Sequence, residues 1–345
     1  MCPCPDEFLI FYPLIAAMTS DRNLLEVHHL TAAFESEVGL LRAVDDVSFC
    51  VPRGQCVGIV GESGCGKSVT AMSLVRLLPR PSGHILGGRV LFNGEDILKM
   101  KSRRLNEVRG GKIGVIFQDP MSALNPVHRI GDQIAESLML HRGMSRENAW
   151  LEAVNMLHFV RLPDPEARAR EFPGSLSGGM RQRVVIAIAL ACRPELIIAD
   201  EPTTALDVTV QQQILALIRE LREKMGSSAI LITHDLGVIA QNCDRVVVMY
   251  AGRVVESAGV KELFANPRHA YTRALLSSMP RLEYPRKSQL PTIPGQVAPI
   301  RHYVEGCRFC QRLERTGPSL LQRPPLVEIA PDHLVEACPH CSSLI

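Results

Sequence analysis

Gly61-Glu62-Ser63-Gly64-Cys65-Gly66-Lys67-Ser68 is the stretch that decides the fold of this 345-residue chain. It follows the pattern G-x-x-x-x-G-K-S, and the continuous apolar run Cys56–Val60 directly precedes it. Such a run indicates a strand that is buried on both faces of a parallel sheet. Residues 68–78 then have the apolar content of a helix, which Pro79 and Pro81 would end. Strand, glycine-rich loop and helix together predict an α/β nucleotide-binding domain.

The loop is suited to holding the phosphates of a nucleoside triphosphate. Its three glycines let backbone N–H groups turn towards phosphate oxygens, and the helix that follows adds the partial positive charge of its N-terminus. Lys67 is expected to reach the β- and γ-phosphates, and Ser68 to bind Mg²⁺ through its hydroxyl. The predicted nucleotide-binding residues of this stretch are Gly61, Glu62, Ser63, Gly64, Cys65, Gly66, Lys67, Ser68 and Val69.

Acidic and polar side chains follow three further apolar runs. Asp200 and Glu201 end the run 196–199, His234 follows 230–233, and Gln118 follows 115–117. Ligands of a doubly wound sheet gather at the carboxyl ends of its strands. There Asp200 can meet Mg²⁺, and Glu201 is placed to accept a proton from an attacking water molecule.

A second glycine-containing motif, Leu176-Ser177-Gly178-Gly179-Met180, precedes the Asp-Glu pair. Together the motifs resemble those of the ATP-binding cassette (ABC) ATPases. The resemblance implies that His234 contacts the γ-phosphate, that Gln118 touches Mg²⁺ or the attacking water, and that Phe34 stacks on adenine. The expected catalytic residues are then Glu201, His234, Gln118 and Lys67, and the expected Mg²⁺ ligands are Ser68, Gln118 and Asp200.

The resemblance also implies a dimer. In this family Ser177, Gly178 and Gly179 close over the ATP of a partner subunit, and Asp207 in Ala205-Leu206-Asp207 crosses the same interface. The chain contains one set of these motifs. A second ABC ATPase, expected to be a related but distinct chain, would supply the other set.

Composition along the chain suggests the following division. Strands are expected at 24–27, 43–51, 89–93, 112–118, 229–233 and 245–250, with a helix over 210–224, and helical apolar spacing over 130–160. We expect an α/β P-loop core of the ABC type, with a helical insertion subdomain and a small C-terminal extension. The predicted parts are a disordered extension over 1–21, the ATPase domain over 22–260 with its helical subdomain at about 119–175, and, over 261–345, a proline-rich linker to a small element with clustered cysteines.

The C-terminal third of the sequence narrows the resemblance to one group within this family. The stretches 266–276, 292–297 and 306–309 are similar to ATPase subunits of oligopeptide and dipeptide importers, and nickel and glutathione importers use related subunits. Implied partners are two transmembrane permeases and an extracytoplasmic solute-binding protein. The chain itself would lie at the cytoplasmic face of the cell (inner) membrane. Peptides are the favoured cargo, with nickel and glutathione left open.

Four cysteines in this tail form two C-x-x-C pairs, Cys307 with Cys310 and Cys338 with Cys341. Paired motifs of this kind indicate Zn²⁺ or an iron–sulfur cluster, although the gap between the pairs exceeds the usual zinc spacing. Some members of the resembling family bind a cluster here with a different cysteine pattern, and this chain has Leu313 and Leu320 at two of those positions. Zinc, [4Fe–4S] and unliganded thiols all stay open.

Charge and hydropathy weigh against nucleic-acid-binding and secreted classes of protein. The 38 basic and 36 acidic residues give a net charge of +2, so no electrostatic case arises for nucleic acid. A soluble ABC ATPase acting on nucleic acid or ribosomes would carry two cassettes or a long coiled coil, and neither is evident. The apolar run 8–17 follows Asp6 and Glu7, unlike a signal peptide, and translation from Met18 would remove it.

Overall fold

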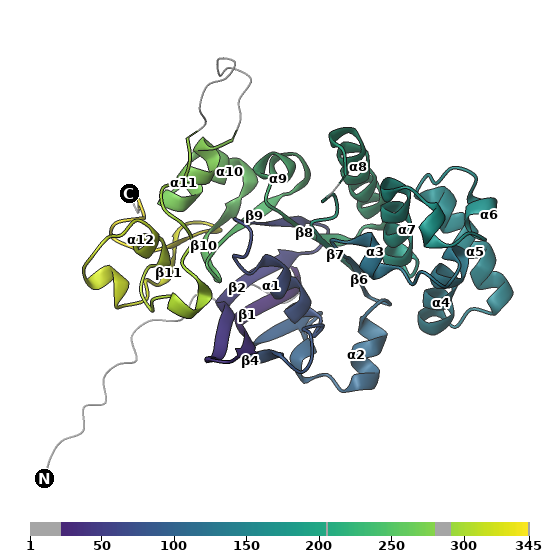
Figure 1. Cartoon of the computed structure of the whole chain (residues 1–345), viewed down its shortest axis with the longest axis horizontal. Coiled ribbons are helices and arrows are strands. Elements are labelled where there is room, and N and C mark those ends of the chain that lie inside the picture. The colour runs from purple at the N-terminus through teal and green to yellow at the C-terminus, as the bar shows by residue number, and fades with distance from the viewer. Residues whose placement is uncertain (1–21, 205, 280–290, 344–345) are drawn as a thin grey trace, which may run out of the picture.

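The computed structural model describes residues 22–204, 206–279 and 291–343 and contains two sheets (Figure 1). The smaller sheet is antiparallel in the order β2-β1-β4-β5, and the larger has eight strands in the order β11-β12-β10-β9-β3-β8-β7-β6. The bounds of the smaller sheet are β1 Asn23–Ser36, β2 Gly39–Pro52, β4 Gly83–Phe92 and β5 Glu95–Asp96.

Five strands of the large sheet are parallel and carry the motifs. They are β3 Cys56–Val60, β6 Ile113–Ile116, β7 Leu196–Asp200, β8 Ser228–Thr233 and β9 Arg245–Tyr250. Alternate residues of β7 enter different cores: Ile197 packs against the helices α7 (Gly178–Leu190) and α8 (Val208–Met225), and Ile198 faces the side of α1 (Lys67–Leu74). Burial on both faces explains why these strands are uninterrupted apolar runs in the sequence.

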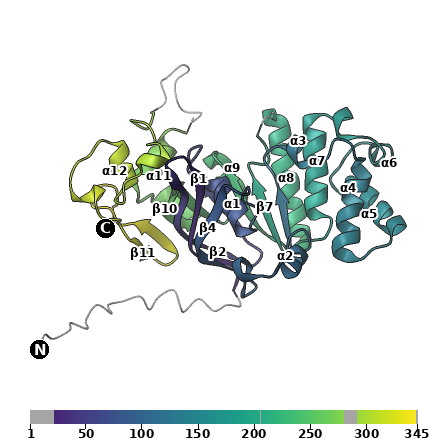
Figure 2. The ribbon, with the colours of Figure 1, turned by 60° about the horizontal axis from the view of Figure 1, so that its bottom comes forward.

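The helices of residues 120–168 form one end of the molecule, opposite the C-terminal extension in both views (Figures 1 and 2). They are α3 Pro120–Ala123, α4 Ile130–Arg142, α5 Arg146–Phe159 and α6 Pro165–Arg168. Their apolar side chains share one core with α7 and α8, which fastens this group to the large sheet. No helix in the described part of the chain is both long and apolar enough to span a bilayer.

The C-terminal residues pack onto the core instead of forming a separate element. The hairpin of β11 Leu326–Ala330 and β12 His333–Glu336 joins the large sheet, where β12 pairs with β10 Arg253–Gly259. Two helices, α10 Val260–Ala265 and α11 Ala270–Ser277, occupy the segment where the linker was expected to begin. The remaining helices are α2 Ser102–Val108, α9 Leu236–Asn242 and α12 Arg308–Arg312. The expectation of a linker starting near residue 261 is therefore wrong, because apolar faces of α10 and α11 pack in the C-terminal core.

Two other expectations need correction. The first strands are longer than predicted and belong to the antiparallel sheet, because β1 and β2 pair along nearly their whole length. The helix after the phosphate loop ends at Leu74 instead of reaching Leu78, and Arg76 has a left-handed backbone with φ of 54°. The Arg76 side chain, two residues beyond the end of the helix, donates a hydrogen bond to the Met100 carbonyl, and this contact holds the turn. The extension over 1–21 lies outside the described residues, as do Ala205 and residues 280–290.

Candidate nucleotide-binding and catalytic site

The predicted catalytic residues meet at the carboxyl ends of the parallel strands, around Glu201. Its Oε2 lies 3.4 Å from Gln118 Nε2 and 3.5 Å from His234 Nδ1, and its Oε1 lies 3.9 Å from Lys67 Nζ. Thr204 donates a hydrogen bond of 3.0 Å to the same carboxylate. Three strands and the phosphate loop therefore deliver their polar groups to one carboxylate.

Asp200 and Ser68 form a second contact beside this carboxylate. The Ser68 hydroxyl donates to Asp200 Oδ1 at 2.9 Å, and Asp200 is buried. Burial raises the pKa of the Asp200 carboxyl, Glu201 raises it further, and Ser68 and Lys67 lower it. A hydroxyl and a carboxylate at this separation are oxygen ligands of the kind Mg²⁺ takes. These two side chains and Gln118 could hold that ion, so the donor set fits the predicted cofactor.

The phosphate loop, residues 61–68, is shaped by close backbone approaches. A Cβ on Gly61 would lie 2.2 Å from the Met249 carbonyl oxygen, and a Cβ on Gly66 would lie 2.6 Å from the Ala43 carbonyl oxygen. Gly66 also has φ of 100° and caps α1 without a side-chain acceptor, so the first N–H groups of the helix have no side-chain cap. Glycine is required at both positions, and the uncapped helix start fits an anion.

Lys67 is buried within the loop and uses backbone carbonyls as partners. Its ammonium group donates to the Gly61 carbonyl at 2.8 Å and to the Glu62 carbonyl at 3.1 Å. These bonds hold a positive charge where the loop curls, ready for phosphate oxygens. Cys65 lies in the same loop, and burial raises the pKa of its thiol, which favours a neutral packing role over a reactive one.

The C-terminal extension contacts the phosphate loop, which sequence motifs did not reveal. The Glu62 N–H donates to the Tyr271 hydroxyl at 3.0 Å, and Arg312 Nη1 lies 2.5 Å from Glu62 Oε2. Tyr271 comes from α11 and Arg312 from α12, far along the chain from the loop. Their residue types carry no local signal of this role. Only the packing of the extension against β9 and β10 brings them there.

The second glycine motif lies on the surface at the start of α7. Ser177 caps this helix by accepting from the Met180 N–H at 3.4 Å, and Gly178 is exposed. A Cβ on Gly179 would lie 2.9 Å from Val210 Cγ1, so this glycine allows α8 to approach. Asp207 caps α8 and is also exposed. In the described part of the chain, we find no hydrogen bond or ion pair from these residues to the phosphate loop.

Phe34 lies on β1, and no hydrogen bond or ring contact joins it to the phosphate loop in the described part of the chain. It pairs with Leu41 on β2 and with Gly83 on β4. The carbonyl of Ala43, two residues beyond Leu41, is the group that approaches Gly66. The half-buried ring is thus on the hairpin that borders the loop.

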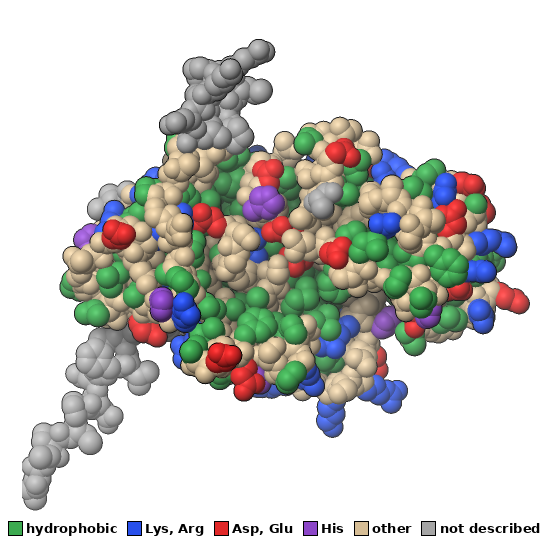
Figure 3. Space-filling model, in the orientation of Figure 1, with side chains coloured by type: hydrophobic (Ala, Val, Ile, Leu, Met, Phe, Trp, Pro, Cys, Tyr) green, Lys and Arg blue, Asp and Glu red, His purple; other side chains and the backbone are tan. Residues whose placement is uncertain are grey.

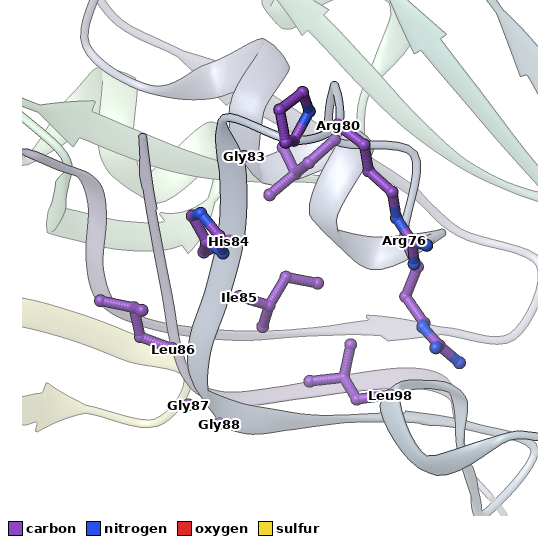
Figure 4. A pocket seen from close by; sticks show the side chains of 11 residues that line it. Arg76, Arg80, Gly83, His84, Ile85, Leu86, Gly87, Gly88 and Leu98 are labelled. Atoms are coloured by element: carbon purple, nitrogen blue, oxygen red, sulfur yellow. The ribbon is translucent and has the colours of Figure 1, made fainter. Parts of the chain in front are cut away.

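A cavity of about 620 Å³ lies away from this chemistry (Figure 4). It is lined by the segment after α1, by β4 and by Leu98 of the turn after β5, and by no residue of the phosphate loop. The lining includes Arg76, Arg80, His84 and Leu86. Hydrophobic side chains gather over the small sheet in the lower middle of the space-filling view (Figure 3). The cavity contains none of the predicted site residues.

The structure also brings the four tail cysteines together. Cys307, Cys310, Cys338 and Cys341 are all buried, and their sulfurs lie within 4.8 Å of one another. The first pair lies at the start of α12 and the second in a turn after β12. The four thiols are therefore one cluster, separate from the nucleotide site.

Comparisons with known proteins agree with this geometry. The ABC transporter family matches residues 44–204, and the oligopeptide/dipeptide transporter C-terminal region matches 255–317. A probable peptide ABC transporter ATP-binding protein of Sinorhizobium fredii is 52% identical over 90% of this chain and 93% of its own length. The oligopeptide transport ATP-binding protein OppD of Bacillus subtilis is 46% identical over 91% of this chain and 88% of its own.

Solved structures extend the likeness to the fold. The dimeric, post-hydrolysis structure of an ATP-binding cassette bound to ADP and Pi has a TM-score of 0.62 and 28% identity, covering 68% of this chain and 98% of the cassette. The fold class and the resemblance predicted from sequence are both confirmed. The chain is an ATPase of the ABC transporter family, with the C-terminal region of the oligopeptide and dipeptide transporters.

Proposed function

We propose that this chain hydrolyses ATP to energise the uptake of dipeptides and oligopeptides across the cytoplasmic membrane. The observation that carries the proposal is the meeting of Lys67, Gln118 and His234 around Glu201 in a chain that has the peptide-transporter C-terminal region. Relatives named for peptide, oligopeptide and dipeptide transport support the cargo class. None of these names concerns nucleic acid.

Within this proposal each residue at the sheet edge has one task. Glu201 accepts the proton of the attacking water, while Gln118 and His234 orient that water and the γ-phosphate. Lys67 neutralises charge on the β- and γ-phosphates. Mg²⁺, held by Ser68, Asp200 and Gln118, would offset the negative charge that gathers on the phosphate oxygens. Phe34 stacks on the adenine ring.

The active form is a dimer with a second ABC ATPase subunit. Ser177, Gly178 and Asp207 are exposed in this chain, and a helix N-terminus with close backbone access suits the phosphates of a neighbouring chain's ATP. Binding of two ATP molecules between two such domains would close the dimer, and hydrolysis would reopen it. We propose a heterodimer with a related but distinct chain.

The membrane partners would dock on the helical region that follows Gln118. Met121 and Val127 lie there with 47% and 73% of their surface exposed, which suits an apolar helix of a permease subunit. In this assembly the chain is peripheral, at the cytoplasmic face of the membrane, with two permeases and an extracytoplasmic solute-binding protein. The division proposed for the chain is an ATPase domain over 22–260, with its helical subdomain at about 119–175, and an extension over 261–345.

We also propose that the four-cysteine cluster holds a metal centre, for which the sequence leaves Zn²⁺ and [4Fe–4S] open. The four buried, adjacent sulfurs support a metal group over isolated thiols, since thiolates are the ligands that both prefer.

Uptake measurements test the cargo. Cells that lack this chain should lose accumulation of radiolabelled di- and oligopeptides, and the wild-type gene should restore it. Lys67→Ala should not restore uptake, whereas the control Cys192→Ser, far from the site, should. Loss of nickel or glutathione uptake with intact peptide uptake would contradict the peptide assignment and leave the ATPase assignment standing.

Affinity purification from detergent-solubilised native membranes tests the partners. We expect two permeases, a second ABC ATPase and a solute-binding protein among the proteins identified by mass spectrometry. Recovery of only soluble or nucleic-acid-associated proteins would contradict the transport role.

A further inference from the structure

The four sulfurs of the cysteine cluster are closer together than an iron–sulfur cube allows. Cys310 Sγ lies 3.4 Å from Cys341 Sγ and 3.5 Å from Cys338 Sγ, and Cys307 Sγ lies 3.8 Å from Cys341 Sγ. All four fall within 4.8 Å of one another. We compare this spacing with the sulfur–sulfur distances that each kind of metal centre requires.

A single tetrahedral ion fits this spacing. With a metal–sulfur bond of about 2.3 Å, neighbouring sulfurs of a tetrahedron lie about 3.8 Å apart. In a [4Fe–4S] cluster each thiolate binds a different iron, so the inorganic core lies between the sulfurs and holds them farther apart. The cysteines are free thiols in this structure, with sulfurs well beyond the roughly 2.05 Å of a disulfide. Tetrahedral coordination by four thiolates is typical of zinc.

The surroundings of the cluster also suit thiolates. The Cys310 N–H points at Cys307 Sγ at 3.4 Å, and Arg315 Nη1 lies 3.9 Å from Cys341 Sγ. Backbone N–H groups and a nearby guanidinium stabilise negative sulfur, as outer contacts do in metal sites. Leu313 and Leu320 pack against the same apolar core and take no part in the sulfur cluster.

We propose that Cys307, Cys310, Cys338 and Cys341 bind one Zn²⁺ ion in a structural site. The inference rests on the metal centre proposed above and names its ion and nuclearity. The ion ties the turn after β12 to the first turn of α12. Because α12 carries Arg308, which lies 2.6 Å from Asp45, and Arg312, which contacts Glu62, the zinc site also positions the arginine that contacts the phosphate loop.

Metal content of the full chain, purified anaerobically without chelators, tests the proposal. We expect one zinc per chain, no iron and no acid-labile sulfide by elemental and chemical analysis. Cobalt exchanged for zinc should give the visible bands of a tetrahedral four-thiolate site. Cys310→Ser and Cys341→Ser should each lower zinc to well under half an ion per chain, whereas Cys192→Ser, a lone cysteine between α7 and β7, should keep it.

The wild-type result decides even where a variant fails to fold. Four irons with four sulfides per chain would overturn the zinc assignment while leaving a metal centre. One iron per chain would also overturn the assignment to zinc. Protein without either metal would overturn both the zinc site and the proposed metal centre. None of these results bears on the peptide importer proposal, which the uptake measurement tests separately.

Discussion

The proposed catalytic edge around Glu201 and the support, formed by Asp45 with Arg253 and Arg308, each centre on a carboxylate, but most of their contacts differ in length. Glu201 accepts one hydrogen bond of 3.0 Å, from its near neighbour Thr204, and meets the groups from other segments, Gln118, His234 and Lys67, only at 3.4–3.9 Å. Asp45 accepts from Arg253 at 2.8 Å and from Arg308 at 2.6 Å, and all three side chains are buried. The side chains around Glu201 thus make mostly long contacts with one another, whereas Asp45 makes short ion pairs with its two arginines.

This difference follows from what each region must do. Catalytic groups need spare hydrogen-bonding capacity for phosphate, metal and water, and they tighten only when these bind. Buried charges in a support have no later partner, so each must already be paired to offset its desolvation. Long contacts in one region and short contacts in the other therefore separate ligand-binding groups from groups that hold the fold.

The largest effect should come from replacing the carboxylate of the catalytic edge. Glu201→Gln keeps the shape of the side chain but removes the proton acceptor, so the steady-state ATPase rate should fall about 10²–10⁴-fold. Thermal unfolding and nucleotide binding should change little, and ATP should trap the closed dimer with the partner ATPase on gel filtration. Glu223→Gln, an exposed glutamate on α8, serves as the control. Hydrolysis near the wild-type rate would refute the role of Glu201.

Breaking the support should instead affect folding. Asp45→Asn leaves two buried guanidinium groups without their counter-charge, which should lower the free energy of unfolding by about 3–5 kcal/mol. Asp46→Asn, next to it, removes a half-buried carboxylate that pairs with Arg323 and His29 near the surface, and should cost under about 1 kcal/mol. Differential scanning calorimetry of both variants makes the comparison. Equal unfolding temperatures would contradict the distinction between the two regions.

Acid sensitivity should also arise in the C-terminal extension, which contains His269 and Glu336. Burial lowers the pKa of His269 to about 3, and the nearby Glu336 carboxyl, with its pKa raised to about 7 by burial, is neutral in acid. The unfolded chain takes up a proton on this histidine below about pH 6.5 while the folded chain does not, so the His269 contribution to stability falls by about 1.4 kcal/mol per pH unit between 6.5 and 3. Glu336 contributes in the opposite direction between about pH 7 and 4.5, because there the folded chain is the form that holds its proton.

His269→Asn keeps an acceptor for the Tyr271 N–H and removes that titration. The unfolding temperature at pH 5.5, relative to that at pH 7.5, should therefore be higher in the variant than in the wild type. His158→Asn, an exposed histidine on α5, should leave the difference unchanged. An unaltered pH dependence in His269→Asn would show that its titration is not part of the acid response.

The smallest effect should come from the hydrogen bond that joins the C-terminal extension to the phosphate loop. Tyr271→Phe removes the acceptor of the Glu62 N–H and so loosens the phosphate loop, with a loss of about 1 kcal/mol. The Kd for ATP, measured by calorimetry, should rise about 5-fold. Tyr303→Phe is the control, because its hydroxyl makes no hydrogen bond that we find in the described part of the chain. Unchanged affinity in Tyr271→Phe would mean that the extension does not steady the loop.

Local pattern accounts for the parts of the site that sequence could predict. Gly61 to Ser68, Gln118, Asp200, Glu201 and His234 each sit directly after an apolar run, and the carboxyl ends of parallel strands share one edge of a sheet. These residues therefore meet because the strands that carry them are parallel and end at the same edge. Strand ends were less predictable, since β1 and β2 gain length by pairing with each other and α1 stops where contacts from Met100 hold Arg76.

The sequence by itself determined the phosphate loop, the motif residues at the sheet edge and the pairing of cysteines into two short loops. Tertiary structure alone decided that β12 extends the central sheet, that Tyr271 and Arg312 reach Glu62, and that the two cysteine pairs form one buried cluster. The physical reason is the range of each interaction. A motif acts through neighbours along the chain, whereas these contacts join residues about 30 to 250 positions apart, and only the packing of the extension onto the core brings them together.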